Sequence, residues 1–491
     1  MKLQNRQDYR IMAFELPKQF EDRMREILGD GFAAFRDSYE KERNQGLRLN
    51  LLKTDPESWE KQNPFHLRPV PWASEGTAKG FYYGSEDRPG LHPYHAAGVY
   101  YMQEPSAMLP AELIGADEAG KNGEWVLDLC AAPGGKTTQT ASGMQGGGLL
   151  IANEIDPARS RILSQNVERM GIRNCIVTNS DPDGLVGPLS GKMDRILVDA
   201  PCSGEGMFRK EDAALAMWSE DNVAMCAERQ EHILEAAYEM LAPGGRIVYS
   251  TCTFAPAEDE LQVERFLEKH PDMHAVSPDQ EVNGVSAGIR ELVKTHAEEI
   301  GKTFRIWPHI SDGEGHYAAV IRSDAPKLTG NAKTATKKTK GAFRSPDYRK
   351  IYMDAAAEIF RKPEKWCDES RLIQQGECLW LLPTDRASMP HLSGIRVLRQ
   401  GILLGTFARD RFEPDHSLAM ALHPDEVRLC RSYAADSEEI RGFLHGEPIR
   451  EERSGEKGWT LITVDGYSLG WAKLGGGTLK NHYPKGLRTK Y

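Results

Sequence analysis

The stretch that decides the fold reads VLDLCAAPGGKT at residues 126–137, and it is followed by DAPCSG at 199–204 and STCT at 250–253. Each run comes after a short apolar, β-branched stretch that is typical of a buried parallel strand. Strands and helices alternate through this region, which predicts an α/β domain with a doubly wound sheet. The three runs should meet where the strands end. We expect strands at residues 125–129, 149–152, 175–178, 195–198 and 246–250.

The overall composition is that of a globular protein with several domains. A length of 491 residues predicts two to four of them. No apolar run reaches the roughly 18 residues of a membrane span. The opening MKLQNRQDYRIMAF lacks the apolar centre of a signal peptide, so we expect a cytoplasmic protein. Eight cysteines without a CxxC pair argue against a disulfide framework and a structural zinc site, and we expect no metal.

The net charge of −10 is unfavourable for nucleic-acid binding, which depends on Lys and Arg contacts to phosphate. The charge is unevenly distributed, however. Residues 327–350 hold eight Lys and Arg against one acid, and residues 478–491 hold four against none. These segments are compatible with RNA contacts, and equally with a solvated linker and a solvated tail.

The chain divides into five segments by pattern. Residues 1–122 form an N-terminal module with a helical stripe that ends near Leu28, a strand near residues 47–53 and an irregular part at 61–105. Residues 123–325 form the α/β domain, with two final strands near 304–310 and 317–321 as an antiparallel edge. Residues 326–344 are a flexible basic linker. Two small domains follow, an α+β domain at 345–428 and a strand-rich one at 429–491.

The glycine loop after the first strand has two possible ligands. Gly135-Lys136-Thr137 could end a phosphate-binding P-loop, but that loop needs glycine where Cys130 stands, and Pro133 removes one N–H donor. A nucleoside cofactor is the better match. The two glycines allow a close backbone approach, and the next helix directs N–H groups at the ligand.

Two carboxylates support the nucleoside interpretation. Glu154 closes the second strand 20 residues after Gly134, where a doubly wound nucleotide site accepts ribose hydroxyls. An acid there can also serve the following helix, but Asp156 and Pro157 already begin that helix. Asp181, just past the third strand, is a candidate acceptor for an adenine amino group, although aspartate is common in turns.

Cys202 and Cys252 follow the fourth and fifth strands. If those strands are neighbours, their ends lie about 5 Å apart, and both sulfurs reach one planar substrate. A lone cysteine here is usually a small buried apolar residue, but two beside a nucleoside site indicate chemistry. Thiolate addition at carbon-6 of a pyrimidine activates carbon-5 toward an electrophilic methyl group. A second thiol can help remove the carbon-5 proton, and Lys136 is a candidate to stabilise the thiolate.

Together these runs resemble the Sun-type RNA cytosine-5 methyltransferases, in which they occur in the same order. Residues 47–50 (LRLN) and 101–108 (YMQEPSAM) resemble the N-terminal module of that family. Residues 204–210 (GEGMFRK) and the C-terminal third resemble its bacterial F-type branch, which acts on small-subunit ribosomal RNA. The end of the chain, from residues 458–461 (GWTL) to 480–488, resembles an RNA-binding PUA-type domain.

The resemblance implies a Rossmann-like enzyme that uses S-adenosylmethionine and an RNA partner, 16S rRNA or the small ribosomal subunit. It assigns Cys252 as the nucleophile and Cys202 to product release. It assigns Glu154 to the ribose, Asp181 to the adenine, and Asp199 to a place between cofactor and base. The residues that it assigns to the methionine part are Cys130, Ala131, Ala132, Pro133, Gly134, Gly135 and Lys136.

Two other functions remain open from the sequence. The same chemistry could act on transfer RNA, since only the docking domains would differ. A non-catalytic RNA-binding or assembly factor is the second alternative, but such a scaffold needs neither cysteine. DNA enzymes of this chemistry attack with the Pro-Cys cysteine and carry a Glu-Asn-Val run, which this chain lacks. We expect a monomer that binds RNA and no membrane.

Overall fold

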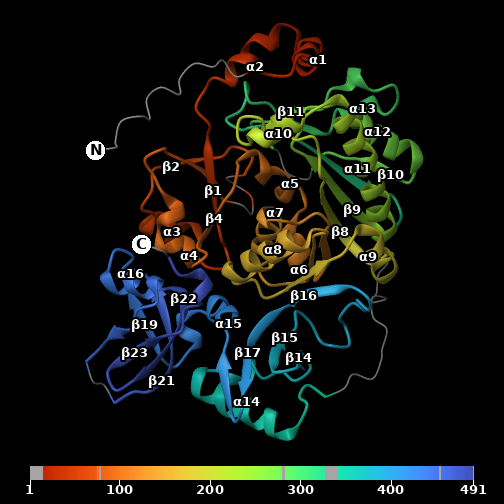
Figure 1. Ribbon diagram of the computed structural model, residues 1–491. Coiled ribbons are helices and arrows are strands. Elements are labelled where there is room, and N and C mark those ends of the chain that lie inside the picture. Colours follow the sequence, from red (N-terminus) through yellow and green to blue (C-terminus); the bar gives the residue numbers. More distant parts are fainter. Residues whose placement is uncertain are drawn as a thin grey trace.

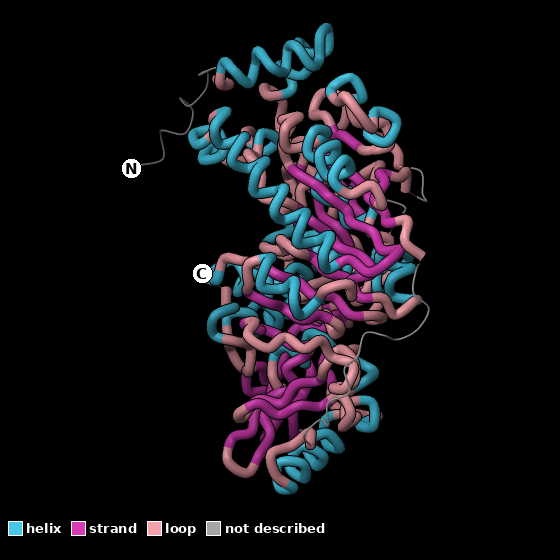
Figure 2. The backbone as a smooth tube through the Cα atoms, turned by 90° about the vertical axis from the view of Figure 1, so that its right-hand side faces the viewer, coloured by secondary structure: helices cyan, strands magenta, loops and turns pink. Residues whose placement is uncertain are grey.

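The computed structural model describes residues 15–73, 76, 79–278, 282–326, 341–452 and 455–489. The N-terminal module and the α/β domain lie side by side, with the two C-terminal domains below them (Figure 1). Seen from the side, the strands of the large sheet cross the middle of the molecule (Figure 2). Within the described part of the chain, no helix has the length and apolar character to cross a membrane.

The central sheet has ten strands in the described residues, in the order β11-β12-β13-β9-β8-β5-β6-β7-β16, with β10 also paired to β13. All five predicted strands are present and parallel, so the doubly wound sheet is confirmed. The order reverses at β5, which places the loop after β5 at the position where such sheets bind ligands. The five strands are β5 (Trp125–Asp128), β6 (Leu149–Asn153), β7 (Cys175–Asn179), β8 (Met193–Asp199) and β9 (Leu241–Thr251).

The antiparallel edge is also confirmed. β13 (His316–Ser323) pairs with β9, and β12 (Phe304–Ile306) pairs with β13. The edge continues with β11 (Ser286–Ala287), while β10 (Met273–Ala275) covers the other end of β13.

Helices cover both faces of the sheet, which explains the nearly continuous apolar strands. Successive residues of β5 point to opposite sides, Val126 into one core and Leu127 into the other. One face carries α5 (Leu109–Leu113), α6 (Ala116–Lys121), α7 (Gly135–Met144) and α8 (Pro157–Arg169). The other carries α9 (Pro182–Leu189), α11 (Glu220–Met240) and α12 (Glu260–Lys269), with α10 (Asp212–Met217) and α13 (Ala297–Ile300) nearby.

The N-terminal module is more ordered than its sequence predicts. The prediction of an irregular stretch at 61–105 is wrong, because three strands there pair around β1 in the order β2-β3-β1-β4. They are only three or four residues long, too short for a recognisable alternation. The elements are α1 (Lys18–Leu28), α2 (Phe32–Ser38), β1 (Gln45–Leu49), α3 (Pro56–Gln62), β2 (Leu67–Pro69), β3 (Gly80–Tyr83), α4 (Pro93–Ala96) and β4 (Tyr100–Met102).

The apolar stripe of the first helix packs onto the α/β domain. Phe20 and Met24 of α1 are fully buried in a cluster with Phe208 and Phe254. Phe208 follows the DAPCSG run and Phe254 follows the STCT run, so the N-terminal helices cover the loops that carry both cysteines.

The segment 345–428 does not stand apart from the catalytic sheet. It has its own sheet, in the order β14-β15-β17-β18, but β16 (Arg396–Gln400) pairs antiparallel with β7 and extends the catalytic sheet. Residues 327–340 of the expected basic linker lie outside the described residues. The other elements are α14 (Pro346–Ile359), β14 (Leu372–Gln375), β15 (Cys378–Leu381), β17 (Ile402–Ala408), β18 (Arg411–Pro414) and α15 (His416–Ala421).

The last domain shares a core with the N-terminal module. Ile440 and Phe443 pack in one cluster with Trp59 and Tyr94. The hydroxyl of Tyr94 donates to Asp465 Oδ2 at 2.9 Å. Removing this domain would therefore uncover the N-terminal module. Its elements are β19 (Cys430–Tyr433), α16 (Glu438–His445), β20 (Ile449–Arg450), β21 (Gly458–Val464), β22 (Tyr467–Gly475) and β23 (Thr478–Asn481).

Candidate active site

The two cysteines that follow β8 and β9 are in contact. These strands are parallel neighbours, and Asp199 is in register with Ser250. The loops after the strands therefore begin side by side. Cys202 Sγ and Cys252 Sγ are 3.3 Å apart, and both residues are partly exposed. A single planar ring can reach both sulfurs, which is the arrangement that the sequence predicts.

The two thiols differ in their surroundings. The hydrogen bond with Cys252 raises the pKa of the Cys202 thiol well above its usual value, and burial and the Glu258 carboxylate act in the same direction. Cys202 therefore keeps its proton at neutral pH and can donate its S–H to Cys252. The pair is arranged so that Cys202 can stabilise negative charge on Cys252.

A charged pair lies at the end of β8, three residues before Cys202. Lys136 Nζ is 2.8 Å from Asp199 Oδ2, and Ser250 Oγ donates to Asp199 Oδ1 at 2.9 Å. Burial would raise the pKa of Asp199, but the Lys136 ammonium and the nearby His316 together hold it below its usual value. Asp199 is thus an ionised acceptor beside the thiols. The side chain of Lys136, predicted to stabilise a thiolate, is placed against this carboxylate instead.

The glycine loop connects β5 to α7 and leaves the first turn of α7 open. Gly134 precedes α7 with a φ of 111°, and because glycine has no side chain it cannot cap this end of the helix. Neighbouring elements fix the loop backbone: Ala131 N donates to Asn153 O at 2.8 Å, and Asn166 Nδ2 donates to Pro133 O at 2.8 Å. Uncapped N–H groups at a helix start favour a ligand with acceptor atoms. Burial raises the pKa of the Cys130 thiol, so Cys130 stays uncharged.

Glu154 and Asp181 lie just past the neighbouring strands β6 and β7. Glu154 is buried, and its Oε1 accepts from Asp156 N at 2.9 Å, while Asp156 itself caps α8 as predicted. Asp181 is exposed and caps α9 through Gly184 N at 2.7 Å. Both carboxylates therefore have a role in the loop backbone. Asp181 keeps its second oxygen for a ligand, whereas Glu154 Oε2 is 3.5 Å from Nη1 of the exposed Arg159.

Asp128 is a polar residue of this cradle that sequence reasoning missed. It closes β5 and is 1 % exposed; Thr137 Oγ1 donates to its Oδ2 at 2.6 Å, while its Oδ1 is buried without a partner among the described residues. Burial raises the pKa of Asp128 to about 7, against the effect of Thr137. An unpaired buried acceptor beside an open helix end fits the amino and hydroxyl groups of S-adenosylmethionine.

The N-terminal module reaches this cradle through Arg48 of β1. Arg48 is fully buried; its Nε donates to Gln103 Oε1 at 2.7 Å, and its Nη2 donates to Gly135 O at the start of α7. Burial lowers the pKa of Arg48 to about 9. Spacing along the chain gave no sign of this contact, because 87 residues separate the two partners.

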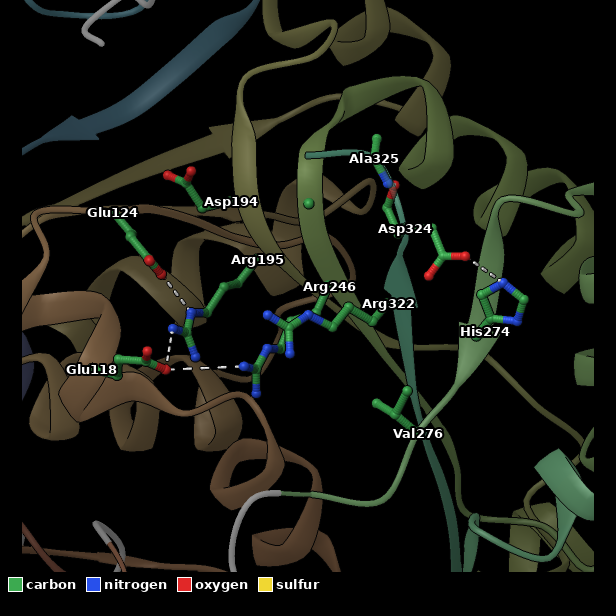
Figure 3. Close-up of a pocket in the computed structure, with 12 residues that line it drawn as sticks. Glu118, Glu124, Asp194, Arg195, Arg246, His274, Val276, Arg322, Asp324 and Ala325 are labelled. Atoms are coloured by element: carbon green, nitrogen blue, oxygen red, sulfur yellow. Dashed lines mark hydrogen bonds and ion pairs between the residues drawn. The ribbon is translucent and has the colours of Figure 1, made fainter. Parts of the chain in front are cut away.

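A cavity of about 430 Å³ lies at the opposite, amino-terminal ends of the strands (Figure 3). Arg195 there pairs with Glu124 at 2.6 Å and with Glu118 at 2.7 Å. The guanidinium group of Arg195 is therefore already paired with carboxylates. The cavity lies at the opposite end of the strands from the two cysteines.

Family models match the chain along most of its length. A model described as 16S rRNA methyltransferase RsmB/F matches residues 119–322. The N-terminal domain of 16S rRNA methyltransferase RsmF matches residues 16–105, the first C-terminal domain of the RsmF rRNA methyltransferase matches 356–422, and the RsmF PUA domain matches 430–489.

Comparison with complete proteins indicates the same family. Ribosomal RNA small subunit methyltransferase F of Cronobacter sakazakii is 32% identical over 96% of both chains, and that of Erwinia tasmaniensis is 31% identical over 96% of both. The crystal structure of a methyltransferase homolog from Pyrococcus horikoshii is 30% identical and covers 63% of this chain and 96% of its own, with a TM-score of 0.55. S-adenosylmethionine is the cofactor. The chain belongs to the RsmB/F family of 16S rRNA methyltransferases, with the RsmF arrangement of domains.

Proposed function

We propose that this protein methylates carbon-5 of a cytidine in small-subunit ribosomal RNA through a covalent bond between Cys252 and carbon-6. The observation that carries the proposal is the thiol pair, 3.3 Å apart, beside an ionised acid and the open end of α7. A fold for methyl transfer alone does not need two thiols in contact at the carboxyl ends of neighbouring strands.

The chemistry uses the two sulfurs in turn. The Cys252 thiolate adds to carbon-6, and the electron pair of the 5,6 double bond moves to make carbon-5 nucleophilic. Bound S-adenosylmethionine supplies the methyl group that carbon-5 takes up. Once the Cys252 sulfur is bonded to carbon-6, it is no longer an anionic partner for Cys202, so the main cause of the raised Cys202 pKa is removed and Cys202 can release its proton to solvent. The Cys202 thiolate then removes the proton from carbon-5, the double bond re-forms, and Cys252 leaves as a thiolate.

The assignment of Cys252 as the attacking residue rests on family resemblance and on the hydrogen bond in the pair. Cys202 keeps its proton because of the raised pKa described above, so it can donate to the Cys252 sulfur before attack. Asp199 then offers an acceptor to the exocyclic amino group of cytosine, which uracil lacks. We assign Glu154 to the ribose of the cofactor, and Asp181 to its adenine through the second carboxylate oxygen.

The direct test is to map 5-methylcytosine across ribosomal and transfer RNA from cells with and without the gene. We expect the modification to disappear from 16S rRNA and to stay unchanged in transfer RNA. The names of the similar bacterial proteins favour this target. Loss confined to transfer RNA would redirect the proposal to the alternative substrate, and no change in either RNA would support the non-catalytic alternative.

The PUA-type domain offers a surface for RNA. Trp459 of β21, Lys473 of β22 and Lys480 of β23 lie in register across three strands, and both lysines are exposed. Lys473 Nζ is 5.3 Å from the centre of the ring of Trp459, which is partly buried. Aromatic and basic side chains in one row can stack bases and contact phosphates.

Replacing Lys473 and Lys480 with alanine should weaken RNA binding and leave cofactor binding unchanged. The slope of log affinity against log salt should fall by about one for each of these lysines that binds a phosphate. Fluorescence anisotropy with a labelled rRNA fragment at several salt concentrations measures both the affinity and the slope. Lys121→Ala, an exposed lysine of α6 on the amino-terminal side of the sheet, is the control. A salt slope equal to the wild type would exclude this row from the RNA surface.

A further inference from the structure

The loops that carry the two cysteines are tied together by hydrogen bonds. We call residues 200–208 and 252–259 the loop pair. Gly206 N donates to Cys252 O at 2.9 Å, and the hydroxyls of Ser203 and Thr253 are 2.8 Å apart. Phe254 N donates to Glu205 Oε2 at 3.1 Å. The distance between the sulfurs therefore depends on contacts made by the residues next to them.

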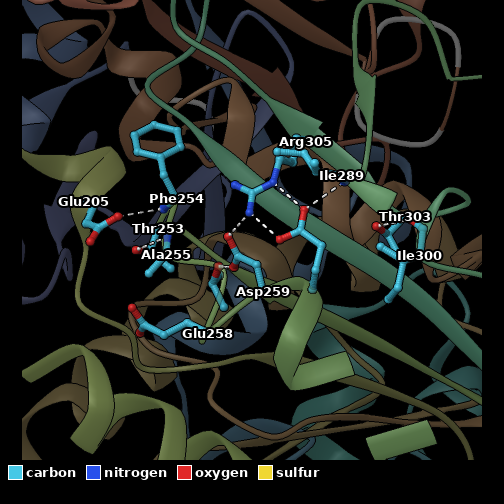
Figure 4. Close-up of polar contacts among 12 residues, drawn as sticks. Glu205, Thr253, Phe254, Ala255, Glu258, Asp259, Ile289, Ile300, Thr303 and Arg305 are labelled. Carbon is cyan, nitrogen blue, oxygen red and sulfur yellow. Dashed lines mark hydrogen bonds and ion pairs between the residues drawn. The ribbon is translucent and has the colours of Figure 1, made fainter. Parts of the chain in front are cut away.

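Glu258 is the residue of the loop pair that holds the backbone around Cys202. Figure 4 draws its side chain together with that of its neighbour Asp259, which pairs with Arg305. Glu258 Oε1 accepts from Ser203 N at 2.9 Å and from Gln230 Nε2 at 3.0 Å, and its Oε2 accepts from the Ser203 hydroxyl. Gln230 Nε2 also donates to Pro201 O at 3.1 Å. Both chain neighbours of Cys202 are thus fixed by one carboxylate and one amide, each fully buried.

The environment of Glu258 differs from that of the two acids that follow it. Arg305 donates to Glu260 Oε1 at 2.7 Å and lies 3.0 Å from Asp259 Oδ2, so a cation accompanies those carboxylates. The donors to Glu258 are instead uncharged. Burial raises the pKa of Glu258 to about 7, against the effect of Ser203. A buried carboxyl without a cation costs folding free energy, and a packing role alone would be filled better by an apolar side chain.

We propose that Glu258 is a positioning residue for product release: through Ser203 and Gln230 it keeps the Cys202 sulfur against Cys252, where it can reach the carbon-5 proton. The inference rests on the function proposed above, and it adds a residue outside the glycine loop and the thiol pair. Cys252 directly follows Thr251, the last residue of β9, which is paired with Tyr317 of β13. Loss of Glu258 should therefore misplace Cys202 more than Cys252.

Glu258→Ala separates this role from a structural one. We expect the variant to form the covalent RNA adduct but to resolve it slowly, with a turnover about 100-fold below the wild type, the effect of misplacing a reacting group by about 1 Å. The adduct is measured as a shifted band on a denaturing gel, in parallel with cofactor affinity by calorimetry and Tm. Glu258→Gln keeps an acceptor for Ser203 N and should recover much of the turnover.

The control is Glu260→Gln, an equally buried carboxylate on the same segment that binds Arg305. It should lower Tm without increasing the adduct. Ser203→Ala provides a second test if Glu258→Ala does not fold, because it removes one contact to Glu258 and should give a weaker accumulation of adduct.

The outcomes separate the two proposals. Wild-type turnover in Glu258→Ala, or joint loss of adduct formation and cofactor binding, would overturn the role of Glu258. Cys202→Ala is run alongside; if it too gives no adduct and the wild type makes no 5-methylcytosine, the proposed function itself fails.

Discussion

Cys252→Ala should abolish methyl transfer and leave cofactor binding nearly intact. Without a thiolate at carbon-6, carbon-5 of the pyrimidine remains a poor nucleophile, and no other step of the reaction can begin. Loss of an enzyme's nucleophile lowers the rate by on the order of 10⁴-fold or more. Transfer of a tritiated methyl group from S-adenosylmethionine to small-subunit rRNA measures the rate, and calorimetry measures cofactor affinity.

The result depends on Cys252 lying outside the cofactor cradle. The contacts that fix this cradle come from β5, α7, β6 and α8, whereas Cys252 follows β9. Cys367→Ala, a half-buried thiol of the first C-terminal domain, is the control and should keep wild-type activity. Appreciable methyl transfer by Cys252→Ala would show that Cys252 is not the nucleophile. Cys202 would then be the next candidate for that role.

The catalytic sheet was predictable because its sequence signals are local. Each strand is a short apolar run, and each ends at a polar or glycine-containing turn. Asp156 and Pro157 showed where α8 begins, and the structure places both there. The sequence alone does not give the order of the strands in the sheet. The contact between the two cysteines follows only if β8 and β9 are neighbours, as they are in the structure.

The parts that could not be predicted depend on contacts distant in sequence. β16 pairs with β7 across more than 200 residues, and a five-residue strand does not reveal its partner. The short strands of the N-terminal module carry prolines and aromatics, which look irregular until β1 pairs with them. The N-terminal module and the last domain also share a core, which the sequence of either segment alone does not indicate.

The residues of the candidate site also fall into those that the local sequence indicates and those that only the structure reveals. Spacing drew attention to the cysteines, the glycine loop and Glu154, because their positions follow strand ends. It did not single out Glu258, whose carboxylate reaches Ser203 across 55 residues, or Arg48, which comes from a separate module. The sequence indicates Lys136 as a positive charge that could stabilise a thiolate, but only the structure shows that its partner is Asp199.

Cys202→Ala should trap the enzyme on its RNA. After carbon-5 has gained the methyl group, it still holds the proton that must leave before Cys252 can be eliminated. Cys202 Sγ lies 3.3 Å from Cys252 Sγ, and carbon-5 is one bond from the carbon that Cys252 attacks, so Cys202 is well placed to act as the base. Removing it leaves the first bond intact and blocks the second step.

The trapped complex is stable to denaturation because it is covalent, and it should appear as a band of reduced mobility on a denaturing gel. The double variant Cys202→Ala/Cys252→Ala should give no such band, which distinguishes a bond to Cys252 from aggregation with RNA. The two single variants therefore have opposite signatures: one forms no adduct, and the other cannot release it. Normal turnover without a band in Cys202→Ala would leave Cys202 as a packing residue and would require another base near carbon-5.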